Sequence, residues 1–284
     1  MSVTSWISCR FFLERIPEDR CNELVCYLSQ KEKEELISAP SSCFDLSSIP
    51  LTIEQRISRV HYSWFIEFLT SINEHDRLLI ISSFDATHRE KLRKYFHIHQ
   101  SLVPINIHGR RYLLNILFHW LTSDQQGFVP VEWIPRHPLN ALTTLSKDRM
   151  QMLIDYLGLH DLAIEMKRLV KTTRITKIHA ILTHAQRDYL QSLLKGKELI
   201  SFIRIHLDRW DGDEKQLRDI LHHRGLNRLA KALFGSPPSL LWDVYHILDI
   251  GRSKILKRFF TDISNEYLKE LLIKQILELI DRVR

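Results

Sequence analysis

Glycine is scarce in this chain of 284 residues, which holds eight glycines and none before Gly109. Loops that bind nucleotide phosphates need closely spaced glycines, and neither GxxxxGKS/T nor GxGxxG occurs in the chain. Two-residue hairpins also favour glycine in their turns. The scarcity argues against a nucleotide-binding loop and against a barrel of tight hairpins, so helices are the main element that we expect.

The chain also lacks the common catalytic and metal-binding motifs, because neither HExxH nor GxSxG occurs. It does contain 15 histidines, but the nearest pairs do not have the spacing of metal ligands. Adjacent histidines on a helix point about 100° apart, which favours solvated side chains. The sequence therefore predicts no enzyme, no cofactor and no metal site. The pairs considered are His97/His99, His179/His184 and His222/His223.

Long apolar runs are missing as well, and we expect no signal peptide. No run approaches the roughly 20 apolar residues that cross a bilayer, and residues 1–15 have no basic region before their apolar residues. All four cysteines, Cys9, Cys21, Cys26 and Cys43, lie near one end of the chain. That distribution favours free thiols in a reducing compartment, so we expect a cytoplasmic protein without membrane insertion.

Charged residues make up 26% of the chain and leave a formal net charge of +6. Basic residues are scattered among acidic ones, and the locally basic stretch from His88 to Arg111 lacks the aromatic spacing of a single-strand binding surface. We therefore expect the charged side chains to lie on solvated helix faces, and we do not expect nucleic-acid binding.

Apolar residues at helical spacing fill most of the chain, which predicts an all-α fold. Thr52 and Thr183, each followed three residues later by glutamine, are typical of capping boxes. The Ser- and Pro-rich stretch 38–50 suggests a boundary, and we expect a small N-terminal helical segment at 1–50 and helical domains at 51–175 and 176–284. Trp133 lies in a Pro-rich stretch that is either a connection or a partner-binding loop.

Two segments resemble each other: residues 153–170 and 217–234 share six of eighteen positions without gaps. Repeated short helices favour an armadillo-like right-handed stack, with a non-repetitive helical bundle as the alternative. Gly158 divides the first segment into two expected helical pieces, and a break at Arg224-Gly225 divides the second.

The stretch 211–260 carries the sharpest helix signals. Asp213 is expected at an N-cap, and Gly235 at a left-handed position that ends a helix. Ser236 is expected to cap the next helix with its hydroxyl before Pro237 and Pro238. A further break is expected at Gly251. Three residues are therefore predicted to be structural hinges: Gly235, Pro237 and Gly251.

The same stretch resembles the flagellar rotor switch protein FliG. Leu229-Ala230-Lys231-Ala232-Leu233-Phe234-Gly235-Ser236 is similar to that family's "LxxALKGA" stretch, and 248–256 is similar to its "MSxRAAxxLxxDL" helix. Residues 211–221 and the closing helix 267–283 also have counterparts, so the resemblance covers roughly the last 110 residues. It implies a stack of short helices.

One departure from the family changes the expected function. Where FliG carries an acidic pair that faces the stator, this chain has Lys257 and Arg258. This reversal implies the scaffold of a rotor component without torque generation. Residues 130–170 are weakly similar to the SctK sorting-platform family of type III secretion.

The resemblance therefore implies a non-enzymatic scaffold of a type III secretion or flagellar-type basal body, located in the cytoplasm or peripherally at the inner membrane as part of that apparatus. Its expected partners are a membrane-ring protein and C-ring or sorting-platform subunits, and it can form an oligomer within that assembly. The alternative is a helical-repeat adaptor or chaperone unrelated to secretion. Five residues are the candidates for partner binding: Arg252, Lys254, Lys257, Arg258 and Trp133.

Overall fold

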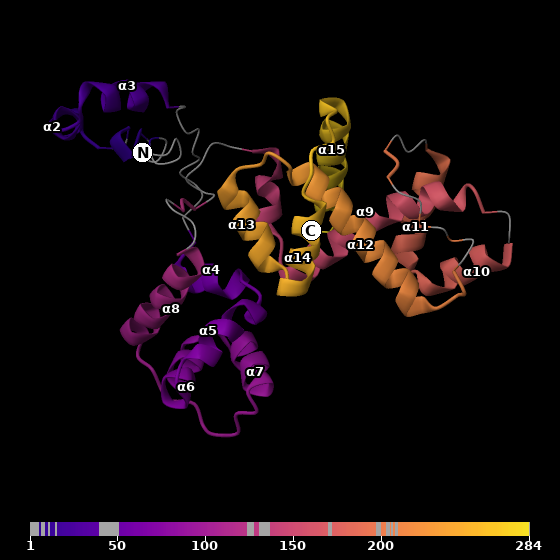
Figure 1. Ribbon diagram of the computed structural model, residues 1–284, viewed down its shortest axis with the longest axis horizontal. Coiled ribbons are helices and arrows are strands. Elements are labelled where there is room, and N and C mark those ends of the chain that lie inside the picture. The colour runs from indigo at the N-terminus through magenta and orange to yellow at the C-terminus, as the bar shows by residue number, and fades with distance from the viewer. Residues whose placement is uncertain are drawn as a thin grey trace. The chain divides into compact units, whose positions relative to one another are not determined.

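The computed structural model describes residues 6, 9–10, 12–14, 16–39, 51–123, 128–130, 137–169, 172–196, 200–202, 205, 207 and 210–283 (Figure 1). Helices make up 75% of the described residues, which contain no strand, and this confirms the prediction of an all-α fold. No helix within these ranges combines the length and the apolar character needed to span a membrane. Trp133 lies outside the described residues.

The chain divides into two compact units. The first unit holds residues 1–140 and 237–249, and the second holds 141–236 and 250–284. These limits differ from the boundaries expected near residues 50 and 175. The chain passes between the units three times, at Asn140–Ala141, at Ser236–Pro237 and at Asp249–Ile250.

A small helical segment begins the first unit. It contains α2 (Glu18–Cys26) and α3 (Gln30–Ser38), and Ser29 and Glu32 form a capping box at the start of α3. Trp6 belongs to a cluster of buried side chains with Leu36, and its indole Nε1 donates to Glu35 Oε2 at 2.6 Å. This segment therefore has a small apolar core of its own.

The rest of the first unit is a helical assembly that includes one helix from far along the sequence. Trp242, on α13, packs with its ring 5.0 Å from that of Phe128 and 5.8 Å from that of Phe118. The Trp64 indole also donates to the Leu248 carbonyl at 2.9 Å. The elements are α4 (Ile53–Arg59), η1 (Tyr62–Phe65), α5 (Ile66–Ser71), α6 (Glu74–Ser83), α7 (Ala86–Tyr95), α8 (Ile107–Thr122) and α13 (Pro238–Ile247).

The second unit is organised around α9 (Lys147–Met166) and α12 (Glu214–Leu233), which hold most of the two similar segments. Their backbones touch at two glycines. A Cβ atom on Gly158 would fall inside van der Waals contact with the Leu221 carbonyl, and one on Gly225 would overlap the Ile154 carbonyl. The remaining elements are η3 (Pro138–Thr144), which straddles the unit boundary, α10 (Thr172–Ile181), α11 (His184–Lys195), α14 (Ile250–Phe259) and α15 (Glu266–Val283).

Several expected helix ends are confirmed. Thr52 and Thr183 each form a capping box with the glutamine three residues on. Asp213 caps α12 by accepting from the backbone N–H groups of Lys215 and Gln216. Gly235 has φ +76°, the left-handed conformation expected after α12.

Other expected breaks are wrong. α9 runs through Gly158 and α12 runs through Gly225, because these glycines permit close helix packing and the helices continue across them. Gly251 lies in the first turn of α14, and the break falls just before it, at Leu248–Asp249. Pro237, not Ser236, is the N-cap of α13, and the buried Ser236 hydroxyl has no hydrogen-bond partner among the described residues.

We predict that Gly225→Ala lowers the free energy of unfolding by about 1–3 kcal/mol, because the new methyl group has to displace the backbone of α9. The matched control is Gly251→Ala, which adds the same methyl group at an exposed position in α14. That change is expected to stabilise the protein by about 0.5–1 kcal/mol through helix propensity. Urea unfolding followed by circular dichroism measures both. Equal effects from the two substitutions would rule out the close contact.

We also predict that Gly235→Val destabilises the protein by about 1 kcal/mol or more, because a β-branched residue is strained at positive φ. Gly196→Val is the control, since Gly196 has φ −87° and ψ 175°, an extended conformation that valine adopts readily. Thermal melting of both variants tests this. An unchanged melting temperature for Gly235→Val would contradict the assigned conformation.

Candidate functional site

The second unit carries most of the positive charge of the chain. It holds 25 of the 40 Lys and Arg residues but only 16 of the 34 Asp and Glu residues, a formal excess of nine positive charges. A surface with this balance attracts acidic partners, and screening by salt weakens the attraction. The candidate binding residues of this unit lie in two cavities and on one exposed helix face.

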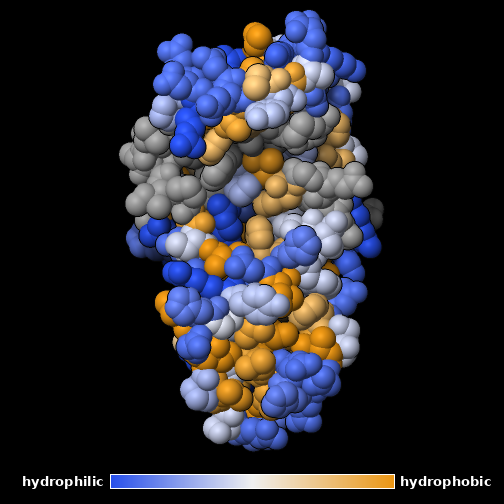
Figure 2. Space-filling model, turned by 90° about the vertical axis from the view of Figure 1, so that its left-hand side faces the viewer, coloured by the Kyte–Doolittle hydropathy of each residue, from blue (hydrophilic) through white to orange (hydrophobic). Residues whose placement is uncertain are grey.

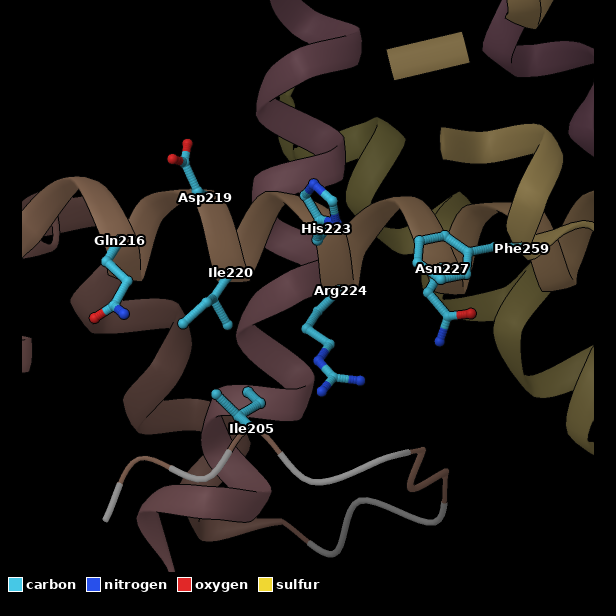
Figure 3. Close-up of a pocket in the computed structure, with 8 residues that line it drawn as sticks. All are labelled: Ile205, Gln216, Asp219, Ile220, His223, Arg224, Asn227 and Phe259. Carbon is cyan, nitrogen blue, oxygen red and sulfur yellow. The ribbon is translucent and has the colours of Figure 1, made fainter. Parts of the chain in front are cut away.

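One cavity, which we call the α12 groove, has a volume of about 470 Å³. Figure 3 shows that Gln216, Ile220, Arg224 and Asn227 project from α12 on the side of Ile205, while Asp219 and His223 project from the opposite edge of the helix. Phe259, near the end of α14, completes the apolar part of the lining. The α12 groove is lined by Ile205, Gln216, Asp219, Ile220, His223, Arg224, Asn227 and Phe259. Asn227 is 9% exposed, and its side chain projects from α12 on the same side as Arg224 (Figure 3).

A second cavity, of about 490 Å³, is bordered by α9, α11, α12 and α14. Within it His222 Nδ1 lies 2.7 Å from Asp155 Oδ1, and Arg252 Nε donates to His222 Nε2 at 3.0 Å. A guanidinium group only donates, so Nε2 is the acceptor and the proton of the neutral ring is on Nδ1. Asp155 and Arg252 thus fix the orientation and the tautomer of His222.

Beneath these cavities lies a buried ion pair. Arg228 has 0% exposure, and its guanidinium donates to Asp161 Oδ1 at 2.6 and 3.0 Å. It also donates to Gln275 Oε1 at 3.0 Å and to the Ile200 carbonyl at 2.9 Å. Burial raises the pKa of the Asp161 carboxyl above its ordinary value, and the neighbouring Arg228 opposes the rise.

The structure separates the four basic residues that the sequence grouped on one face of α14. Lys254, Lys257 and Arg258 are exposed, whereas Arg252 is half-buried against His222. Spacings of three and four residues place the three exposed side chains on one side of the helix. We call Lys254, Lys257 and Arg258 the α14 basic face. α14 contains no acidic residue.

Hydrophobic side chains are also exposed on the first unit, in the lower part of the view in Figure 2. Tyr112 and Ile116 are one turn apart on the outer side of α8. Exposed apolar residues are normal when isolated, but neighbouring ones mark possible contact surfaces.

Sequence reasoning missed the α12 groove and the buried pair. Arg228 falls within the apolar stripe of Leu217, Leu221 and Ala232, and a charged residue in such a stripe is a signal of a buried ion pair. The α12 groove had no comparable signal, because Ile205 and Phe259 come from separate segments.

Within the described ranges, no group of three or more His, Cys, Asp or Glu residues is arranged to hold a metal ion. No family model, curated protein or solved structure matches the chain. The candidate sites therefore have to be judged from their own chemistry.

We predict that Arg228→Met lowers the free energy of unfolding by about 3–5 kcal/mol near pH 7, because it leaves Asp161 buried without its cation. The loss of the cation raises the folded-state pKa of Asp161 further. Folding then favours the protonated form, so stability falls as pH rises from the ordinary carboxyl pKa of 3.8 through the folded-state pKa. The deficit should be smaller at about pH 4 than at about pH 7.

Arg218→Met is the matched control, because Arg218 pairs with Glu214 at 2.9 Å on the surface of the same helix. It should cost less than about 1 kcal/mol. Urea unfolding at the two pH values measures both variants. A deficit for Arg228→Met that is the same at both pH values would contradict the assigned role of Asp161.

Proposed function

We propose that the protein is a non-enzymatic cytoplasmic scaffold of a type III secretion or flagellar-type basal body. In this role it links a membrane-ring protein to cytosolic C-ring or sorting-platform subunits. The single observation that carries the proposal is the α14 basic face, on a unit with nine excess positive charges. Such a face suits an acidic surface of a neighbouring protein.

Two further features support this proposal. The segment 229–236 resembles the FliG motif, and its Gly235 has φ +76°. α9 and α12 contain similar sequences and pack directly on each other, as paired repeats in an armadillo-like right-handed stack would. We therefore propose that the helices belong to that architecture.

The reversed charge at Lys257 and Arg258 favours a static scaffold over a motor component. Torque generation in the FliG family uses an acidic pair at this position, so a stator surface adapted to that pair would be repelled. A basic face instead holds an acidic neighbour in place.

The alternative is a helical-repeat adaptor or chaperone unrelated to secretion. The exposed Tyr112 and Ile116 on α8 favour it, because clients with apolar segments bind to exposed apolar side chains. Binding that survives high salt and depends on α8 would support this alternative.

We predict that the double reversal Lys257→Glu and Arg258→Glu weakens capture of purified membrane-ring and C-ring-type proteins. The association rate should fall by about 10-fold at low salt, because charge complementarity acts mainly on encounter. At about 1 M salt the difference should largely disappear. Surface plasmon resonance at several ionic strengths measures this.

The matched control is Arg187→Glu with Lys195→Glu, which makes the same change in net charge at exposed positions on α11 of the same unit. If both double variants slow association equally, only the overall charge matters. Unchanged capture by the Lys257→Glu, Arg258→Glu protein at every salt concentration would overturn the proposal.

A further inference from the structure

We propose that Asp155, His222 and Arg252 form a proton-sensitive switch in the second unit. When the His222 ring gains a proton, Arg252 is released from α12, and the first turn of α14 loses this polar link to that helix. The inference goes beyond the proposed scaffold function and does not depend on it, because all three residues lie within the second unit.

The hydrogen bonds of the neutral His222 ring leave one arrangement of protons. Nδ1 lies 2.7 Å from Asp155 Oδ1, and Arg252 Nε lies 3.0 Å from Nε2. A carboxylate only accepts and a guanidinium only donates. The neutral ring therefore donates from Nδ1 to Asp155 and accepts at Nε2 from Arg252, so both of its nitrogens are satisfied.

A protonated His222 ring can keep only one of these two bonds. An imidazolium carries a hydrogen on each nitrogen and has no acceptor. The bond from Nδ1 to Asp155 persists and becomes charge-assisted. At Nε2, two N–H groups and two positive charges would face each other across 3.0 Å. The bond to Arg252 is therefore the one that breaks.

The surroundings of His222 limit the screening of this repulsion by water. The His222 side chain is 13% exposed, and that of Asp155 is 33% exposed. Leu182, Leu221 and Ile255 line the same cavity and contribute apolar surface. Charges at such a site interact more strongly than charges in bulk water.

Other charged groups border this cavity and give the released guanidinium a place to go. Asp219 is exposed beside the cavity, and its carboxylate can accept from Arg252 after the switch. Arg218 is already bonded to Glu214 and to the Ile181 carbonyl. The polar lining comprises Asp155 from α9, the uncharged Gln186 from α11, Arg218, Asp219 and His223 from α12, and Arg252 from α14.

The switch acts on α14, the helix that carries the α14 basic face. Arg252 lies in the first turn of this helix, while Leu256 is buried one turn further on. α14 packs on α12, so the apolar contact of Leu256 holds the helix in place when Arg252 leaves. The change is therefore a local loosening of the first turn.

The first test locates the protons on His222 in the full chain. Histidine ordinarily gains its proton between about pH 8 and about pH 5, so two-bond ¹H–¹⁵N NMR spectra are recorded at these two values. We expect a proton on Nδ1 alone at the higher pH and on both nitrogens at the lower pH. A proton on Nε2 at the higher pH, or a bare Nε2 at the lower pH, would overturn the inference.

The second test follows α14 by amide hydrogen exchange, with each rate divided by the intrinsic rate at that pH. The amides of Lys254 to Leu256 bond to the carbonyls of the first turn. Loss of a hydrogen bond to a charged group changes an equilibrium by about 10-fold, so their protection should fall by that factor at the lower pH. The amides of Ile276 to Ile280 in α15 should keep theirs. Unchanged protection in α14, or an equal fall in α15, would count against the switch.

His222→Gln and His223→Gln form a matched pair, because each removes one histidine from α12. Glutamine at position 222 offers Arg252 an acceptor that takes up no proton in this range, so the response of α14 to pH should disappear. His223 is exposed and borders the same cavity, so the response should survive its replacement. The same result from both variants, whether loss or retention, would show that His222 is not the sensor.

Arg252→Met tests the other end of the link. It keeps an apolar stem but cannot donate to His222, so the first turn of α14 should be as weakly protected at the higher pH as the unaltered protein is at the lower pH. Circular dichroism checks that each variant retains its helix content. Full protection in the Arg252→Met protein at the higher pH would show that this bond does not hold α14, and the inference would fall.

Discussion

The direct backbone contact between α9 and α12 is the constraint on which the second unit depends. Gly158 and Gly225 let the two helices approach until a methyl group no longer fits between them. α11 packs on α9, α14 packs on α12, and α15 packs on both. Because one side of α12 is held against α9, the side that carries Gln216, Ile220, Arg224 and Asn227 is left to line the α12 groove.

The buried ion pair gives that contact a single register. Leucine-rich helices tolerate sliding, because one apolar contact can replace another. The Arg228 guanidinium instead reaches Asp161 on α9, Gln275 on α15 and the Ile200 carbonyl. A shift of one helical turn would break these bonds and leave charges unpaired, which is far more costly than exchanging apolar contacts. The same pair therefore fixes the distance between α9 and the loop at Ile200.

Local signals in the sequence predicted helix caps and turns correctly. They failed where the structure of a residue depends on a segment far away in the sequence. Thr52, Thr183, Asp213 and Gly235 act through hydrogen bonds or dihedral angles within a few residues, and each is placed as expected. A mid-helix glycine is ambiguous, since the close approach of another helix cannot be seen in its own segment. Ser236 failed for a related reason, because Pro237 took the capping position. The α14 basic face was predictable from spacing, but the inward turn of Arg252 depends on His222, 30 residues earlier.

The placement of α13 has a consequence for how this protein can be divided. Residues 237–249 leave one unit, supply Trp242 to the core of the other and return. A truncation after residue 140 would keep α4 to α8 but remove the indole that packs on Phe118 and Phe128. A fragment starting at residue 141 would carry α13 without the core that buries it. A cut between residues 140 and 141 therefore yields no fragment that holds one complete unit and nothing else. We expect the two units to be inherited and exchanged together.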